Sequence, residues 1–132
     1  MAVVDTKQIR NVVLLGHGGC GKTSLAEAML YITKATDRLG NIGDGNTVSD
    51  YDAEEIKRGF SLSASLLNTS WKDCKINIID APGYLDFVGE TAQALRVADS
   101  AIIVVDGKAG IEIGTELAWN YATDAGLPKA FL

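Results

Sequence analysis

The chain has 132 residues, of which 47% are hydrophobic and 22% are charged, a size and composition typical of one globular domain. Its 12 Lys and Arg against 17 Asp and Glu give a net charge of −5, so we expect no direct binding to nucleic acid or to an anionic membrane. The apolar runs are too short to span a bilayer, no signal sequence is evident and the two cysteines make no disulfide framework, which predicts a cytoplasmic location.

The first predicted elements flank a glycine-rich loop. Residues 9–15 are mostly aliphatic and predict a buried parallel strand, whereas residues 24–30 contain strong helix formers. Between them lies Gly16-His17-Gly18-Gly19-Cys20-Gly21-Lys22-Thr23, which fills every position of the pattern G-x-x-x-x-G-K-[ST]. Because the motif requires a strand before it and a helix after it, all eight residues are predicted to contact nucleotide phosphates. Lys22 is expected to reach the β- and γ-phosphates, and the Thr23 hydroxyl to hold Mg²⁺.

Cys20 has two interpretations. Its position beside Lys22 at a helix N-terminus is one that can lower a thiol pKa and make the thiol reactive. A Cys–His nucleophile would, however, have to draw both residues from the same phosphate loop. We therefore favour a small residue that fills a tight turn.

A long segment between Thr33 and Ser61 follows, and loops of this length are usually functional or disordered. Its charged part, residues 50–58, can form a helical turn with Glu54 and Arg58 paired at i, i+4, or it can be a solvated surface. Residues 61–71 partly alternate polar and apolar side chains, which indicates an antiparallel edge strand. A turn at residues 71–74 would join it to the next strand as a hairpin.

A second motif stands at the end of the strand predicted over residues 75–79. Asp80 follows this strand directly, and Asp80-Ala81-Pro82-Gly83 has the form D-x-x-G. Since open α/β sheets bind ligands at the carboxyl ends of their strands, Asp80 is placed to serve Mg²⁺ and the Gly83 N–H to approach a γ-phosphate. An ordinary turn is the alternative when the motif stands alone, but the phosphate loop in the same topology favours the functional interpretation.

The remaining segments alternate in the βαβ manner: a helix from about 86 to 98, a strand at 101–105, a helix at 115–125 and a strand that begins at 129. Gly126 suits a left-handed cap for the last helix. The predicted fold is an α/β P-loop NTPase: a three-layer, doubly wound, mostly parallel sheet with one antiparallel edge strand.

Together the motifs resemble the GTP-binding domain of translational GTPases, and among these elongation factor G and its relatives. The resemblance covers nearly the whole chain and rests on the phosphate loop and residues 50–61, 80–90 and 95–101. It implies a GTP-binding and GTP-hydrolysing switch of a ribosomal translation factor, with GTP or GDP and Mg²⁺ as ligands and the ribosome as partner of the full-length protein. The roles that it implies are Mg²⁺ ligation by Thr23, Ser61 and Asp80, catalysis by Lys22, Gly83 and Tyr84, and nucleotide contacts by Asp80, Pro82, Gly83 and Tyr84.

Three positions depart from the family pattern. Ser61 replaces the usual switch threonine and can still ligate Mg²⁺. Tyr84 replaces the histidine that orients the attacking water, and Gly19 replaces a frequent aspartate. We therefore expect slow hydrolysis, and the alternative function is a nucleotide-dependent ribosome-binding module with little GTP turnover. A metabolite kinase is less favoured, because the D-x-x-G turn and the predicted switch are typical of a GTPase.

The sequence holds no counterpart of the family's guanine-recognising N-K-x-D motif or of its last strand and helices. Residues 1–132 are therefore expected to be one partial GTP-binding domain of a longer factor. Guanine specificity is implied by the resemblance alone, and the 132 residues by themselves are expected to be weakly active or inactive.

Overall fold

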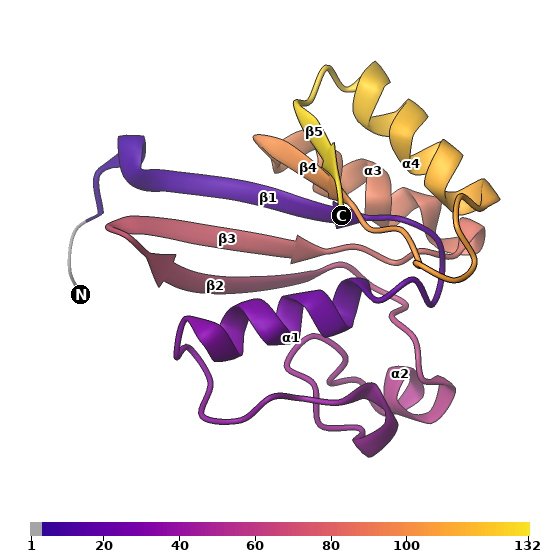
Figure 1. Ribbon diagram of the computed structural model, residues 1–132, viewed down its shortest axis with the longest axis horizontal. Helices are drawn as coiled ribbons and strands as arrows, with labels where there is room; N and C mark the ends of the chain where they lie inside the picture. Colours follow the sequence, from indigo (N-terminus) through magenta and orange to yellow (C-terminus); the bar gives the residue numbers. More distant parts are fainter. Residues whose placement is uncertain (1–3) are drawn as a thin grey trace.

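A computed structural model of the protein describes residues 4–132. Five strands form one sheet in the order β2-β3-β1-β4-β5 (Figure 1). β1 pairs in parallel with β3 and β4, β4 pairs in parallel with β5, and only β2 is antiparallel to its neighbour β3. The strands are β1 (Ile9–Leu15), β2 (Ser65–Trp71), β3 (Cys74–Asp80), β4 (Ser100–Ile103) and β5 (Lys129–Phe131). The mostly parallel sheet with an antiparallel edge strand is thus confirmed.

Helices cover both faces of the sheet, which confirms the three-layer arrangement. The helices of the described chain are α1 (Lys22–Ile32), α2 (Ala53–Arg58), α3 (Val88–Val97) and α4 (Ile113–Asp124), of which α1, α3 and α4 lie against the sheet (Figure 1). α1 packs on one face against Leu14, Leu67 and Ile78, and α3 and α4 lie on the other face (Figure 1). Alternate β1 residues therefore pack into two separate apolar cores, one on each face of the sheet. Within residues 4–132, no helix has the length and apolar character needed to cross a membrane.

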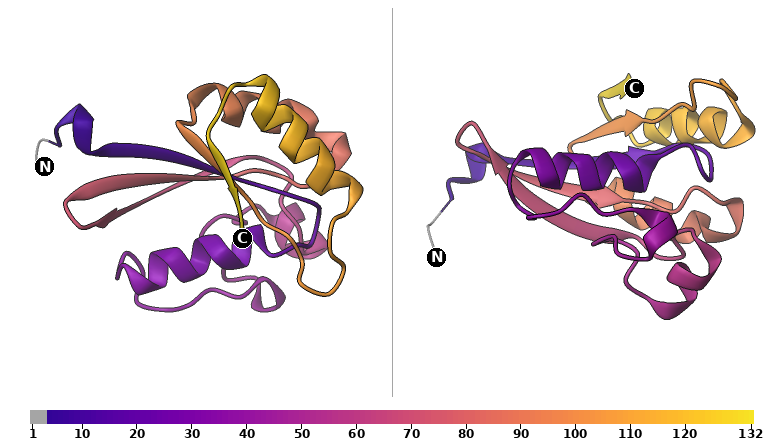
Figure 2. Two further views of the ribbon diagram at one scale, coloured as in Figure 1. Left: turned by 45° about the horizontal axis from the view of Figure 1, so that its top comes forward. Right: turned by 60° about the horizontal axis from the view of Figure 1, so that its bottom comes forward.

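The long connection from α1 to β2 lies along the α1 side of the sheet (Figure 2). Its charged part forms α2, in which the Arg58 guanidinium donates to the Glu54 carboxylate at 2.7 Å, as the i, i+4 spacing predicted. Both residues are half exposed, so this pair contributes little to stability. The Asp52 and Glu55 side chains form a capping box at the start of α2.

Four predicted boundaries need correction, one of which is the start of the helix predicted from residue 115, found at Ile113. β2 begins at Ser65 rather than residue 61, because the backbone N–H groups of Leu62 and Ser63 donate to the Glu55 carboxylate instead of a neighbouring strand. The helix predicted from residue 86 begins at Val88, after a short 3-10 turn over Leu85–Phe87. β4 ends at Ile103, opposite Leu15 and the end of β1, rather than at residue 105.

Candidate functional site

The loop that joins β1 to α1 is shaped by its glycines. Gly16 has φ +141° and lies so close to the carbonyl oxygen of Val104 that a Cβ there would collide with it. Gly21 is the N-cap of α1 at φ +102°, and no side chain caps the helix. The N–H groups in the first turn of α1 therefore have no side-chain acceptor and can meet an anion, which the helix dipole also favours.

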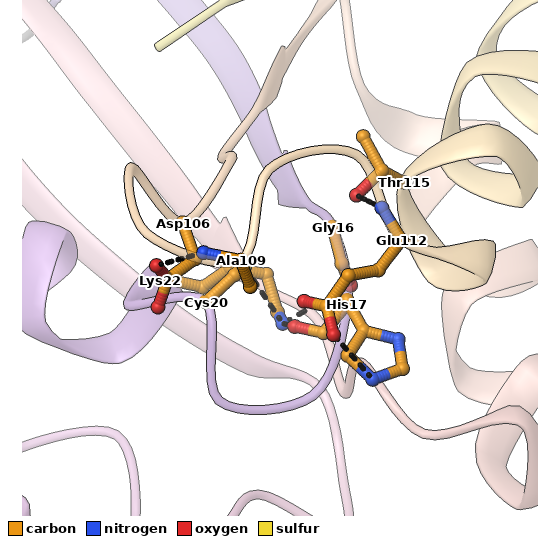
Figure 3. Close-up of polar contacts among 8 residues, drawn as sticks. All are labelled: Gly16, His17, Cys20, Lys22, Asp106, Ala109, Glu112 and Thr115. Atoms are coloured by element: carbon orange, nitrogen blue, oxygen red, sulfur yellow. Dashed lines mark hydrogen bonds and ion pairs between the residues drawn. The ribbon is translucent and has the colours of Figure 1, made fainter.

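Lys22 lies buried at the start of α1 and turns back over this loop (Figure 3). Its ammonium donates to the backbone oxygens of His17 at 2.8 Å and Gly16 at 3.2 Å. Gly83 lies directly beside it, because a Cβ on Gly83 would collide with the Lys22 ammonium. The structure thus brings the two phosphate-binding motifs, far apart in sequence, into contact at one positive charge.

The His17 side chain points out of the loop, toward the start of α4 (Figure 3). Its Nε2 lies 3.6 Å from a carboxylate oxygen of Glu112, and its ring lies where a Cβ on Gly114 would stand. Of the eight loop residues predicted to meet phosphates, His17 therefore faces the loop interior through its backbone. Nothing in the sequence motif distinguishes a backbone contact from a side-chain contact at this position.

Cys20 is buried beneath the loop, with its sulfur 3.8 Å from the Lys22 ammonium. Burial raises the pKa of the thiol, and this outweighs the nearby positive charge of Lys22, which lowers it. A thiol with a raised pKa is a weak nucleophile at neutral pH. This result supports the interpretation of Cys20 as a small packing residue.

Four oxygen-bearing side chains meet beside the N-terminus of α1. The Thr23 hydroxyl donates to Asp80 at 2.7 Å, the Ser61 hydroxyl donates to Asp50 at 2.7 Å, and the two hydroxyl oxygens lie 3.3 Å apart. Each hydroxyl has one proton, and the short bonds use both. The oxygens of Thr23 and Ser61 therefore face each other with lone pairs, an arrangement that suits a hard cation.

The carboxylates of this cluster are short of partners. Oδ1 of Asp80 and Oδ2 of Asp50 are buried and accept no hydrogen bond within residues 4–132. Burial raises the pKa of Asp80 to about 6, against the hydrogen bond from Thr23 and the positive charge of Lys22, which lower it. Burial also raises the pKa of Asp50, and the negative charges of Glu55 and Glu27 add to that effect. Because Mg²⁺ binds carboxylate and hydroxyl oxygens, the cluster fits such an ion.

Tyr84 lies over the phosphate loop, next to the Phe60 ring. The two ring centroids are 4.6 Å apart with the planes tilted by 50°. A Cβ on Gly18 would come within 2.7 Å of the tyrosine ring, so the missing side chain at Gly18 makes room for Tyr84. These residues, with Thr23, Ser61 and Asp50 of the oxygen cluster, line a hollow of about 100 Å³. Three segments of the chain thus enclose one polar space.

Eight of the predicted site residues line this hollow: Gly18, Gly19, Gly21, Lys22, Thr23, Ser61, Gly83 and Tyr84. Gly16, His17, Cys20, Asp80 and Pro82 are not part of its lining, and Pro82 accepts a hydrogen bond from Thr91 through its backbone oxygen. Sequence reasoning missed Asp50, which is 4% exposed and holds Ser61. It also missed Phe60 and Glu55. In the sequence, Asp50 is the first charge of the charged run at residues 50–58. The one signal that could have identified it is this position, a carboxylate at the start of the predicted switch.

Comparison with known proteins agrees with this geometry. A family model described as the elongation factor Tu GTP binding domain matches residues 7–132. A protein of Scheffersomyces stipitis named ribosome-releasing factor 2, mitochondrial, is 41% identical over 126 residues, which cover 96% of this chain and 15% of the relative. A Dehalococcoides mccartyi protein named elongation factor G is 38% identical over 93% of this chain and 18% of its own.

Solved structures show the same similarity. A crystal structure of a Thermus thermophilus protein matches with a TM-score of 0.91 and 41% identity, over 94% of this chain and 19% of that one. A bacterial selenocysteine-specific elongation factor matches with a TM-score of 0.71 and 26% identity, over 89% and 18%. The chain therefore spans between 15% and 19% of the length of these relatives. By the match of the family model to residues 7–132, the chain belongs to the family of the elongation factor Tu GTP binding domain.

Proposed function

We propose that this domain is the Mg²⁺-dependent, GTP-hydrolysing switch of an elongation-factor-G-like translation factor that acts on the ribosome. The observation that carries the proposal is the meeting of Thr23, Ser61 and Asp80 beside an uncapped helix N-terminus. These residues come from the phosphate loop, the long α1–β2 connection and the end of β3. The relatives named elongation factor G and ribosome-releasing factor 2 support the ribosomal role.

In this proposal Thr23, Ser61 and Asp80 hold the ion, which would neutralise phosphate charge. A bound cation would offset the unfavourable free energy of burying Asp80 and Asp50 in their ionised form, because a nearby positive charge favours the ionised carboxylate. Ser61 keeps its hold on Asp50 through its proton while its oxygen faces the ion. Mg²⁺ binding and the position of the α1–β2 connection are thereby coupled.

In the same proposal the phosphoryl oxygens lie against Lys22 and the first-turn N–H groups of α1, where developing negative charge is stabilised. Gly83 offers its N–H next to Lys22, and only a glycine permits that approach. Tyr84 stands over the loop, where its phenol can hydrogen-bond the attacking water. It cannot supply a cation, because a phenol is neutral when it carries its proton and anionic when it loses it.

Single-turnover GTP hydrolysis by the full-length protein, with and without ribosomes, tests the proposal. We expect ribosomes to accelerate hydrolysis, and Thr23→Ala to remove that acceleration because it deletes an oxygen of the cluster. Nucleotide-dependent ribosome binding without accelerated hydrolysis would favour a binding module with little turnover. Hydrolysis that is unchanged by Thr23→Ala would contradict the proposed Mg²⁺ site.

Tyr84→His is expected to accelerate ribosome-stimulated hydrolysis about tenfold or more, because a positioned imidazole contributes about 10²-fold or more to proton-transfer chemistry. The matched control is Tyr31→His, which makes the same exchange on the exposed surface of α1. Rates are compared at saturating ribosome concentration, so that binding differences do not enter. An unchanged or slower rate in Tyr84→His would show that the phenol does not limit hydrolysis.

We propose further that residues 1–132 are one partial GTP-binding domain, and that the full-length protein works in the cytoplasm. The short share of each relative that the chain covers supports the first point. No Asn-Lys-x-Asp run occurs in the sequence, so guanine selectivity is a property to be measured in the full-length protein. Fractionation of cells followed by detection of the protein on ribosomes tests the second point.

A further inference from the structure

Glu27 is a buried carboxylate that the proposed chemistry does not use. It lies in the middle of α1, on the side that faces the α1–β2 connection, and is only 1% exposed. No ion pair with Glu27 occurs in the part of the chain that the structure describes. A buried charge without a cation must be compensated by hydrogen bonds, or burying it would be costly.

Two backbone N–H groups of the α1–β2 connection supply this compensation. Val48 donates to Oε1 of Glu27 at 2.5 Å, and Gly40 donates to Oε2 at 3.2 Å. Gly40 lies so close that a Cβ there would collide with the carboxylate. The Glu27 side chain thus binds the backbone of the α1–β2 connection at two positions that are eight residues apart, Gly40 and Val48.

The segment that Glu27 binds leads directly into the oxygen cluster. Ser49 follows Val48, and its carbonyl accepts a hydrogen bond from the Ser65 hydroxyl at the start of β2. Asp50 comes next and holds Ser61, whose oxygen lies 3.3 Å from that of Thr23. The negative charge of Glu27 also reaches Asp50, where it is one of the causes of a raised pKa, after burial.

We propose that Glu27 is a positioning residue that latches residues 40–48 to α1 and so places Asp50 and Ser61 for Mg²⁺. This inference rests on the proposed function, because the latch is argued to place residues of the Mg²⁺ site that the proposed function requires. Glu27 is given no role as a ligand of phosphate or ion in this proposal. It acts through the backbone that carries Asp50, and Gly40 is the matching half of the latch.

Glu27→Gln in the full-length protein tests the latch. The amide keeps the shape of the side chain but turns one acceptor into a donor, which meets a backbone N–H and breaks one of the two bonds. We expect faster amide hydrogen exchange in residues 40–52 without nucleotide. We also expect Mg²⁺ to be bound about tenfold or more weakly in the nucleotide complex, with nucleotide affinity in EDTA unchanged.

Two further variants sharpen the test. Gly40→Ala disturbs the same contact from the backbone side. The double variant should therefore bind Mg²⁺ no more weakly than either single variant. Glu54→Gln changes a half-exposed carboxylate of α2 and should leave exchange and Mg²⁺ affinity unchanged. Equal exchange in Glu27→Gln and the unaltered protein, or fully additive effects with Gly40→Ala, would overturn the inference. Failure of the unaltered protein to bind GTP would instead overturn the proposed function. GTP binding and amide hydrogen exchange are separate measurements, so the two failures can be distinguished.

Discussion

Lys22→Ala is expected to weaken GTP binding about a hundredfold. A hydrogen bond to a charged group is worth about 1.5 to 3 kcal/mol, and two phosphates would each lose one. Each loss of about 1.4 kcal/mol is a tenfold change in affinity. The Lys22 ammonium is already held over the loop by the carbonyls of Gly16 and His17, so ordering it on binding costs little. Equilibrium titration with a fluorescent, non-hydrolysable GTP analogue gives the affinity directly.

The control for this variant is Lys7→Ala, which removes one positive charge from an exposed position before β1. It lowers the net charge by the same amount without touching the phosphate loop. We expect its affinity to stay within about twofold of the unaltered protein, because exposed charges are screened by salt. If Lys22→Ala binds as tightly as the control variant, the phosphate loop is excluded as the nucleotide site.

Asp80→Asn is expected to raise the stability of the protein without Mg²⁺ and nucleotide and to lower it when both are bound. Without metal and nucleotide, the folded state holds the Asp80 proton more tightly than the unfolded state, because the pKa is raised from 3.8 to about 6. The unaltered protein therefore loses stability as pH rises from about 4 through 6, and it remains less stable above that range. A shift of about two units corresponds to about 3 kcal/mol. At pH 7.5 in EDTA the variant should be more stable by up to about that amount.

With Mg²⁺ and nucleotide the same variant should be the weaker protein, since it lacks the carboxylate charge that the ion requires. Urea unfolding in EDTA at pH 4.5 and pH 7.5, followed by the same measurement at pH 7.5 with Mg²⁺ and GDP, separates the two effects. Asp106→Asn is the control, because Asp106 is partly exposed and its pKa is shifted in the opposite direction, lowered by the N–H groups of Ala109 and Lys108. A variant at position 80 that is less stable in EDTA at both pH values would contradict the raised pKa.

The parts of the fold that were predicted correctly have local signals. The phosphate loop has fixed spacing, β1 and β3 are largely apolar runs, and Asp80 stands at the end of such a run. The hairpin turn at Lys72 and Asp73 was also expected, and both residues have positive φ. Each of these features depends on neighbours in sequence, so one chain is enough to find it.

The parts that were missed depend on contacts between distant residues. Asp50, Glu27 and Glu55 belong to charged or helical sequence that is usually solvated, yet each is at most 4% exposed. Their partners are backbone N–H groups or hydroxyls elsewhere in the α1–β2 connection, where no periodic pattern exists. Burial of a carboxylate is decided by such partners rather than by its own neighbours. The burial of these three carboxylates therefore follows from the packing of the α1–β2 connection against α1, and local sequence does not predict it.

The relation of Tyr84 to Gly18 was hidden for the same reason. The sequence showed Tyr84 as a departure from a family pattern and Gly18 as one glycine of a distant loop. Only the structure shows that the ring of Tyr84 occupies the space above Gly18 and packs on Phe60. The three residues thus form one packed unit over the phosphate loop.

The central claim is that Thr23, Ser61 and Asp80 form one Mg²⁺ site at the phosphate loop, and a single titration tests it most directly. A non-hydrolysable GTP analogue is titrated into the full-length protein in Mg²⁺ and in EDTA, and the same is done with Thr23→Ala. We predict binding at least about tenfold tighter in Mg²⁺ for the unaltered protein, because the ion adds charged contacts worth more than about 1.4 kcal/mol. In Thr23→Ala the two affinities should be nearly equal and close to the EDTA value. Equal affinities in the unaltered protein, or a Mg²⁺ effect that survives in Thr23→Ala, would contradict the account.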